Sequence, residues 1–298
     1  MSFRIRKYAA IDIGSNAIRL LIASVTLFDD EPPVFKKISL VRVPIRLGQD
    51  VFTTKEIGSV NMNRMVKSME SYALLMDVHK VENYKAYATS AMREAQNGEE
   101  VARVIKKKTG INIEIIDGSH EAAIIAMTDL HSMIHDNKVY LYVDVGGGST
   151  EFTLFADGEA KASRSFKIGT VRLLNDMVTK KLWSEAEQWI KEICQPYAKV
   201  ELLGSGGNIN NIYKSSQKST GKPLSYLYLS SYYEKLQSYT YEERVYYLNL
   251  NQDRADVIIP ACRIYLSAMK WSRAKNIYVP KIGLADGIIK SIFNADER

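Results

Sequence analysis

The sequence contains almost the same acidic, glycine-bearing turn twice. Residues 8–22 read YAAIDIGSNAIRLLI and residues 140–154 read YLYVDVGGGSTEFTL. In each copy an apolar run ends at an aspartate, Asp12 or Asp144, and passes through a glycine turn into a second apolar run. Short runs rich in β-branched and aromatic residues, bounded by turn residues, are typical of strands. The repeat therefore predicts two related domains, each built on a strand–turn–strand hairpin.

The two turns suit phosphate. Unpaired backbone N–H groups in a glycine turn point outward and form a concavity that binds anions. A carboxylate beside that concavity would repel phosphate, so Asp12 and Asp144 imply a divalent cation between the charges, or a water that they orient. Glu151 follows on the outgoing strand, where it can share a cation with Asp144. We therefore expect a phosphate-handling cleft between the two domains.

The glycines of the second turn are the sharper signal. Glycine loses more conformational freedom on folding than other residues, so a purely structural hairpin seldom uses three in a row. Without side chains they let the backbone approach a bulky anion closely. The turn consists of Gly146, Gly147, Gly148 and Ser149.

The first turn adds side-chain donors to its backbone. It consists of Gly14, Ser15 and Asn16, with Arg19 just beyond. Because these three residue types favour turns in any case, an ordinary hairpin explains them equally well.

A third glycine turn, GSGGN at 204–208, follows a predicted strand and opens a helix. The N–H groups at a helix N-terminus bind anions, which makes Gly206 and Gly207 candidates. The spacing departs from the GxGxxG fingerprint, so a dinucleotide site is not expected. A generic anion site and a simple strand–helix connector both stay open.

Two charged residues between the repeated turns are candidates for chemistry. Glu121 falls in the first turn of a helix that opens at Gly118 and is expected to bridge the halves. A carboxylate there can accept a proton from a water that attacks phosphorus, although an acid at this position also stabilises a helix start. Arg93 can neutralise a phosphoryl oxygen or form a surface ion pair.

Composition sets the class of protein. The chain of 298 residues is about two domains long, and 46% hydrophobic with 25% charged residues is ordinary for a soluble globular protein. No apolar run reaches the roughly 18 residues that cross a bilayer, and the N-terminus lacks a signal-type stretch. Cys194 and Cys262 fit no metal or disulfide framework, which favours the cytoplasm. The net charge of +6 is compatible with a polyanionic ligand.

Both halves show three strands followed by alternating helices and strands, which predicts an α/β fold with mixed sheets flanked by helices. We expect domains at 1–120 and 121–298, with a final helix, 284–298, able to pack on the first. Strands are expected at 8–13, 18–27, 34–45, 84–88, 111–116, 139–145, 150–156, 159–166, 200–204 and 276–280. Helices are expected at 59–79, 98–108, 170–178 and 184–198, after the turn at 204–208, and over much of 230–272.

The combined pattern resembles the exopolyphosphatase and guanosine pentaphosphate phosphohydrolase family, within the actin, Hsp70 and sugar-kinase superfamily. The blocks that carry the resemblance keep the family's order over almost the whole chain. They are DIGSNAIRL (12–20), ATSAMREA (88–95), IDGSHEAA (116–123), DVGGGSTEF (144–152), IGTVRL (168–173), GSGGN (204–208), RADVII (254–259) and GLADGI (283–288).

The resemblance implies two ribonuclease-H-like (actin-like ATPase) domains and Mg²⁺-dependent cleavage of terminal phosphoanhydride phosphate in the interdomain cleft. Glu121 matches the family's catalytic glutamate, and Asp144 and Glu151 match positions linked to metal and nucleophile orientation. The expected catalytic set is Glu121, Asp144, Glu151 and Arg93, and the expected metal ligands are Asp12, Asp144 and Glu151. The expected phosphate-binding set is Gly14, Ser15, Asn16, Gly146, Gly147, Gly148, Ser149, Gly206 and Gly207; Arg93 also matches a phosphate-contacting position.

Three departures bear on substrate preference. His120 stands where the family often has an acid, Ala123 where an arginine is common, and Asn208 where a threonine is usual. The longer members also have an additional C-terminal helical domain that this sequence lacks, which favours lower processivity on long chains.

The expected substrate is inorganic polyphosphate or guanosine pentaphosphate, with no nucleic acid polymer and no membrane as partner, and the resemblance implies a homodimer. An ATP-dependent kinase of the same superfold and a non-catalytic actin-like module stay open as alternatives. His131 and His135 have zinc-like spacing, but Ser132 stands where the HExxH motif needs glutamate, so we expect no zinc there.

Overall fold

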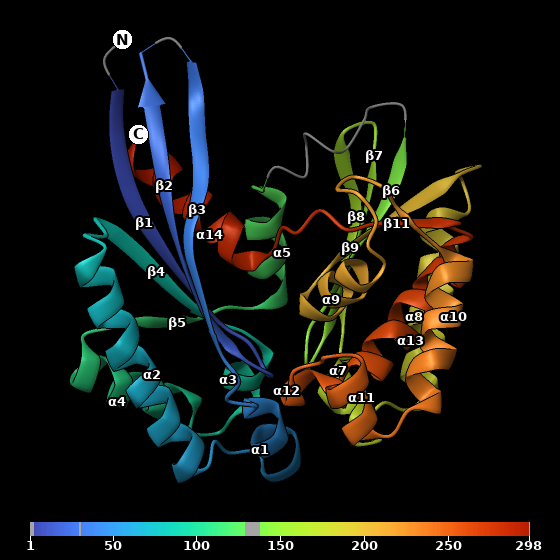
Figure 1. Ribbon diagram of the computed structural model, residues 1–298, viewed down its shortest axis with the longest axis horizontal. Coiled ribbons are helices and arrows are strands. Elements are labelled where there is room, and N and C mark those ends of the chain that lie inside the picture. Colours follow the sequence, from blue (N-terminus) through green and yellow to red (C-terminus); the bar gives the residue numbers. More distant parts are fainter. Residues whose placement is uncertain (1–2, 30, 129–137, 298) are drawn as a thin grey trace. The chain divides into compact units, whose positions relative to one another are not determined.

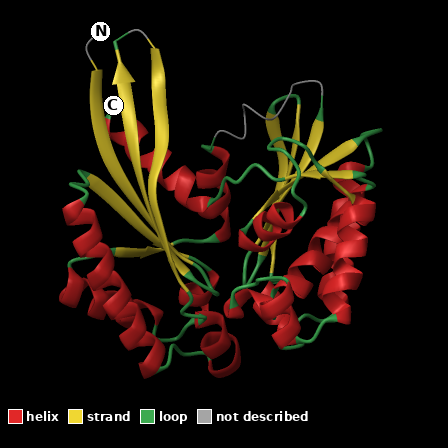
Figure 2. Ribbon diagram, viewed as in Figure 1, coloured by secondary structure: helices red, strands yellow, loops and turns green. Residues whose placement is uncertain are grey.

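The computed structural model describes residues 3–29, 31–128 and 138–297. The chain forms two compact units, one from Met1–Thr128 with Gly283–Arg298 and the other from Asp129–Ile282. Each unit contains one mixed sheet flanked by helices (Figure 1 and Figure 2). The predicted α/β class is confirmed.

The sheet of the first unit has the strand order β3-β2-β1-β4-β5. The first three strands are antiparallel, and β4 and β5 run parallel to β1. β1 becomes fully buried towards its end, which places the first turn next to the core. The strands are β1 (Phe3–Ile13), β2 (Ile18–Phe28), β3 (Glu31–Val43), β4 (Asn83–Ala88) and β5 (Ile113–Ile115).

The helices of the first unit come from both ends of the chain. Phe293 packs edge-on against Tyr8 and Phe35, with ring centroids 6.4 and 5.3 Å apart, so the last helix covers the sheet beside β1. The helices are α1 (Leu47–Thr54), α2 (Ser59–Val78), α3 (Ser90–Glu94), α4 (Gly98–Thr109), α5 (Gly118–Ala126) and α14 (Leu284–Asp296).

The first compact unit extends to Thr128 and includes the last helix, where domains were expected at 1–120, with the final helix able to pack on it, and at 121–298. Residue 120 lies inside α5, and both α5 and α14 belong to the first unit. The two helices pack closely because Gly287 of α14 has no side chain: a Cβ there would overlap the carbonyl group of Ile124. This glycine contact keeps α5 with the first unit.

The second unit repeats the arrangement. Its sheet has the order β10-β11-β9-β6-β7-β8, so β8-β7-β6-β9-β11 matches β3-β2-β1-β4-β5 in order and direction. The strands are β6 (Val139–Val145), β7 (Thr150–Ala156), β8 (Glu159–Phe166), β9 (Val200–Ser205), β10 (Leu224–Ser225) and β11 (Asn276–Tyr278). The helices are α7 (Thr170–Leu174), α8 (Lys180–Cys194), α9 (Gly207–Ser215), α10 (Tyr226–Ser238), α11 (Tyr241–Tyr247), α12 (Gln252–Ala255) and α13 (Ile258–Ser272).

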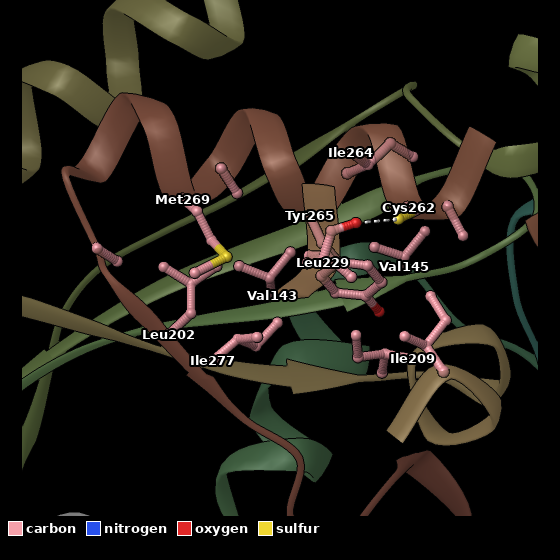
Figure 3. Close-up of a cluster of buried hydrophobic side chains, with 14 of the residues drawn as sticks. Val143, Val145, Leu202, Ile209, Leu229, Cys262, Ile264, Tyr265, Met269 and Ile277 are labelled. Carbon is pink, nitrogen blue, oxygen red and sulfur yellow. Dashed lines mark hydrogen bonds between the residues drawn. The ribbon is translucent and has the colours of Figure 1, made fainter. Parts of the chain in front are cut away.

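Helix α13 supplies much of the core of the second unit. Its Tyr265 and Met269 lie against apolar side chains of β6 and β9, among them Val143 and Leu202 (Figure 3). Cys262 on the same helix is also buried, and burial raises the pKa of its thiol. The two cysteines form no disulfide, as expected. Over the described residues, no helix has both the length and the apolar character needed to cross a bilayer.

Several predicted boundaries are wrong. The helix expected at 184–198 is α8, Lys180–Cys194, because the Thr179 side chain accepts a hydrogen bond from the backbone N–H of Leu182 at 3.2 Å and starts the helix there. The helix expected at 170–178 ends at Leu174. Helices α1 and α3 were not predicted.

Candidate active site

The first turn joins β1 to β2. The N–H of Gly14 donates to the carbonyl of Ala17 at 3.1 Å and closes the turn. The register pairs Asp12 with Arg19, whose Nη1 lies 3.2 Å from Asp12 Oδ2. Burial raises the pKa of Asp12, and the Arg19 charge and hydrogen bond oppose that rise. Asp12 therefore already has a cationic partner within its own unit.

Helix α3 lies beside the first turn. The hydroxyls of Ser15 and Ser90 are 2.9 Å apart, and the N–H of Thr89 donates to the carbonyl of Ile13 at 3.1 Å. Arg93, on the same helix, donates from Nη1 to the carbonyl of Ile116 at 2.6 Å. The first unit thus places the predicted residue Ser15 against the start of α3, and Arg93 against the residue two positions before α5.

Helix α5 carries Glu121, but Asp117 caps it. Asp117 Oδ1 accepts hydrogen bonds from the Ser119 hydroxyl at 2.6 Å and the His120 N–H at 2.7 Å, and these bonds lower the pKa of Asp117. Glu121 is 8% exposed. Because the Asp117 side chain satisfies the helix end, capping alone does not account for a buried carboxylate at Glu121.

The second turn joins β6 to β7 and places two carboxylates opposite each other. The N–H of Gly146 donates to the carbonyl of Ser149 at 2.9 Å. Asp144 and Glu151 are direct partners across the strands, so both side chains lie on one face of the sheet. Glu151 is 3% exposed, and its Oε1 accepts from the hydroxyls of Ser149 at 2.7 Å and Ser165 at 2.8 Å. These two donors hold one oxygen of the Glu151 carboxylate in place.

The hairpins differ at one equivalent position. Seven residues after the aspartate, the first hairpin has Arg19 and the second has Glu151. The first hairpin therefore neutralises its aspartate, whereas the second brings two acids together. Mg²⁺ is commonly bound by one or two carboxylates together with water and phosphate oxygens, so Asp144 and Glu151 fit this ion better than Asp12 does.

The third turn lies next to Asp144. Ser205, at the end of β9, is in register with Asp144, and Gly206 follows with φ 117°. A Cβ on Gly206 would be 3.0 Å from the carbonyl oxygen of Val145 and 3.5 Å from Asp144 Oδ1. This close approach and the positive φ explain the glycine.

Two further side chains fix that turn. The Tyr265 hydroxyl donates to the carbonyl of Ser205, and Arg254 donates from Nη1 to the carbonyl of Gly207. Tyr265 is fully buried, which raises its pKa well above the ordinary value, so it stays a neutral donor.

Three residues near the second turn escaped the sequence analysis as individual candidates: Ser165, Gly169 and Arg172. The hydroxyl of Ser165, on β8, donates to Glu151 on the neighbouring strand β7, and Arg172 donates from Nε to the carbonyl of Gly148 at 2.7 Å. A Cβ on Gly169 would lie 2.5 Å from the carbonyl carbon of Gly148. The sequence signal that could have identified Gly169 and Arg172 was the IGTVRL block (168–173), which follows β8, the third strand of the second unit.

Among the described residues, no group of three or more His, Cys, Asp or Glu side chains is arranged to hold a metal ion. His131 and His135 lie outside the described residues. The expectation that the turns of the two units share one cleft stays a prediction.

Comparisons with known proteins agree on one family. The model of the Ppx/GppA phosphatase family matches residues 27–295. Exopolyphosphatase 2 of Mycobacterium tuberculosis is 28% identical over 277 residues, which are 85% of this chain and 86% of that protein. The bifunctional 3-dehydroquinate synthase/phosphatase of Fusobacterium nucleatum is 35% identical over 196 residues, 62% of this chain, and the match spans 29% of its length.

Solved structures support the fold over nearly the whole chain. The Aquifex aeolicus member of the Ppx/GppA family has a TM-score of 0.76 at 25% identity and covers 99% of this chain and 100% of its own. An exopolyphosphatase from Cytophaga hutchinsonii has a TM-score of 0.83 at 23% identity, covering 97% and 98%. The expected pair of ribonuclease-H-like, actin-like domains is thereby confirmed. Because the family model matches most of the sequence, the chain belongs to the Ppx/GppA phosphatase family.

Proposed function

We propose that this protein is an exopolyphosphatase, a hydrolase that removes the terminal phosphate of inorganic polyphosphate. The observation that carries the proposal is the second hairpin, where a triple-glycine turn directly adjoins the paired carboxylates of Asp144 and Glu151. A nest of N–H groups and two acids suits a phosphate that arrives with a cation. Family membership and the exopolyphosphatase relatives support the same substrate.

The proposed phosphate-binding groups are backbone N–H groups, neutral side-chain donors and the cation of Arg93. In the second unit they come from residues 147–149, since the N–H of Gly146 already donates to the carbonyl of Ser149, and from the start of α9 at Gly206 and Gly207. In the first unit they come from residues 15 and 16, since the N–H of Gly14 already donates to the carbonyl of Ala17, and from Arg93, whose cation offsets phosphoryl charge. Fixed donors stabilise the charge that shifts towards the leaving oxygen without having to reorganise.

Magnesium is the proposed cofactor, and Asp144 and Glu151 would hold it. A bound Mg²⁺ neutralises charge on the phosphate oxygens. The hydrogen bonds from Ser149 and Ser165 keep one Glu151 oxygen fixed. Asp12 was also expected as a metal ligand, but it is a less suitable one than Asp144 or Glu151 because it already forms an ion pair with Arg19.

Glu121 acts as the general base. The water oxygen forms a bond to the terminal phosphorus, the phosphoanhydride P–O bond breaks, and the water proton passes to the Glu121 carboxylate. The products are orthophosphate and a chain shortened by one phosphate. General base catalysis typically contributes about 10² to 10⁴-fold in rate.

The decisive assay measures orthophosphate release from polyphosphates of several lengths, guanosine pentaphosphate and ATP, each with Mg²⁺ or with EDTA. Glu121→Gln should lower kcat by about 10² to 10⁴-fold while leaving the affinity for polyphosphate nearly unchanged. Glu114→Gln, an exposed acid of the same unit, is the matched control. Near-normal turnover by Glu121→Gln would reject this base.

The substrate panel also tests the alternatives. Faster release of orthophosphate from guanosine pentaphosphate than from polyphosphate would identify guanosine pentaphosphate as the preferred substrate. ATP consumption that needs a second substrate would indicate a kinase. Undiminished activity in EDTA would reject the proposal that Mg²⁺ is the cofactor.

We further propose that the protein is cytoplasmic and forms a homodimer. A monomeric mass in light scattering would contradict the homodimer.

A further inference from the structure

One short segment binds all three carbonyl groups of the triple-glycine turn. The backbone N–H groups of Thr170 and Val171 donate to the carbonyls of Gly146 and Gly147 at 3.0 and 2.9 Å. The Nε of Arg172 donates to the carbonyl of the third glycine at 2.7 Å. The start of α7 therefore satisfies the acceptor side of the turn.

This arrangement matters because a carbonyl oxygen that faced an anion would repel it, whereas N–H groups attract it. The first unit uses the equivalent segment after its third strand. There the N–H of Gly48 donates to the carbonyl of Ser15 at 2.8 Å, and the N–H of Arg46 donates to the carbonyl of Asn16 at 3.0 Å. Both turns are thus held from their carbonyl side.

The second unit adds a side chain to this pattern. Arg172 is only 6% exposed. A guanidinium buried to this degree is costly unless its donors are used, so its position needs a reason. Gly169, two residues before Val171, allows the close approach, since any side chain there would overlap the turn.

We propose that Arg172 is a positioning residue for phosphate binding: by fixing the carbonyl of Gly148, it keeps the N–H groups of residues 147–149 directed at the anion. This inference rests on the proposed function in that it takes the turn as the phosphate site. Arg172 itself acts through the backbone and does not need its charge at the substrate.

Substitutions at Arg172 can separate the hydrogen bond to the Gly148 carbonyl from the positive charge of the guanidinium. In glutamine the amide nitrogen lies the same number of bonds from Cα as the Nε of arginine, so Arg172→Gln keeps a donor for Gly148 without the charge. Arg172→Met fills similar space without a donor, and Arg172→Lys keeps the charge but changes the donor position. Arg263→Met removes an exposed arginine that lies over Trp183 and is the matched control.

The experiment uses the full chain in the Glu121→Gln background, labelled with ¹⁵N-glycine and titrated with inorganic triphosphate in the presence of Mg²⁺. The amide signals of Gly147 and Gly148 should move on titration. Arg172→Met should weaken the apparent affinity about tenfold, the size expected for loss of a buried hydrogen bond. Arg172→Gln and Arg263→Met should stay close to the parent, and chemical denaturation checks that each variant is folded.

The outcomes separate the two proposals. Equal affinity in Arg172→Met and the parent, or equal loss in the Met and Gln variants with rescue by Lys, would overturn the positioning role. Triphosphate that moves neither glycine signal in the parent would also overturn it. If the wild-type enzyme releases no phosphate from polyphosphate, the proposed function fails, yet a difference between Arg172→Gln and Arg172→Met would still support positioning.

Discussion

Replacing Gly169 with alanine tests whether the exact position of the triple-glycine turn controls catalysis. The backbone at Gly169 has φ −125° and ψ 163°, an ordinary extended conformation that alanine adopts without strain. The obstacle is space alone. The new Cβ would lie 2.5 Å from the carbonyl carbon of Gly148, and closer to the carbonyl group of Gly147. Because carbon atoms in contact stay about 3.5–4.0 Å apart, the turn must move by roughly 1 Å.

The size of the effect follows from that displacement. A shift of about 1 Å in a catalytic arrangement can cost on the order of 10²-fold in rate, so kcat/KM for polyphosphate should fall about 100-fold. Overpacking typically costs about 1–3 kcal/mol of stability, which leaves the protein folded. Initial rates of phosphate release and urea denaturation measure the two quantities.

Gly283→Ala is the matched control. This glycine also has an extended backbone, φ −157°, and no described atom lies within 4 Å of where its Cβ would be. Its activity should match the wild type. If folded Gly169→Ala retained kcat/KM within about twofold of wild type, a displacement of this size would not matter, and the reasoning about the turn would be refuted.

Two further predictions concern buried polar groups. Burial raises the pKa of Asp12, so the folded state binds a proton more readily than the unfolded chain; wild-type stability relative to Asp12→Asn should therefore fall as the pH rises from about 4 through the folded pKa. Urea denaturation across this range measures the difference, and a constant difference would count against it. Tyr265→Phe removes the buried donor to Ser205 and should lower the unfolding free energy by about 1–3 kcal/mol. Tyr246→Phe, at an 80% exposed residue, should change it by less than about 0.5 kcal/mol, and equal effects would contradict the assignment.

The two hairpins were predictable because local sequence determines them. The strands expected at 139–145, 150–156 and 159–166 agree with β6, β7 and β8 residue for residue. Apolar runs separated by glycine turns leave little choice of register, and that register pairs Asp144 with Glu151. The predicted opposition of acids on adjoining strands therefore followed from the spacing alone.

Helix limits were harder to predict because one side chain can move them. The second helix after β8 was expected at 184–198, whereas the cap at Thr179 starts it at Lys180. Helix α1 was missed since Gly48 and a pair of threonines weaken its helical pattern, and tertiary packing of Leu47 and Phe52 stabilises it instead.

The parts of the site that escaped prediction depend on contacts between distant residues. Nothing local to Arg172 indicates that its Nε lies against Gly148, which is 24 residues away in the chain. The same holds for Tyr265 and Ser205, which are separated by 60 residues. Sequence patterns identify the turns that carry the chemistry, but not the side chains that hold them.

The position of α14 has a consequence for biosynthesis. This helix packs beside β1 in the first unit, where Arg6 forms ion pairs with Asp296 and Glu297, yet it is translated after the entire second unit. Domains usually fold in the order in which they leave the ribosome. The sheet surface around Tyr8 and Phe35 emerges from the ribosome first and stays uncovered until Phe293 has been translated. The nascent chain therefore exposes an apolar surface, which chaperones can protect until α14 is complete.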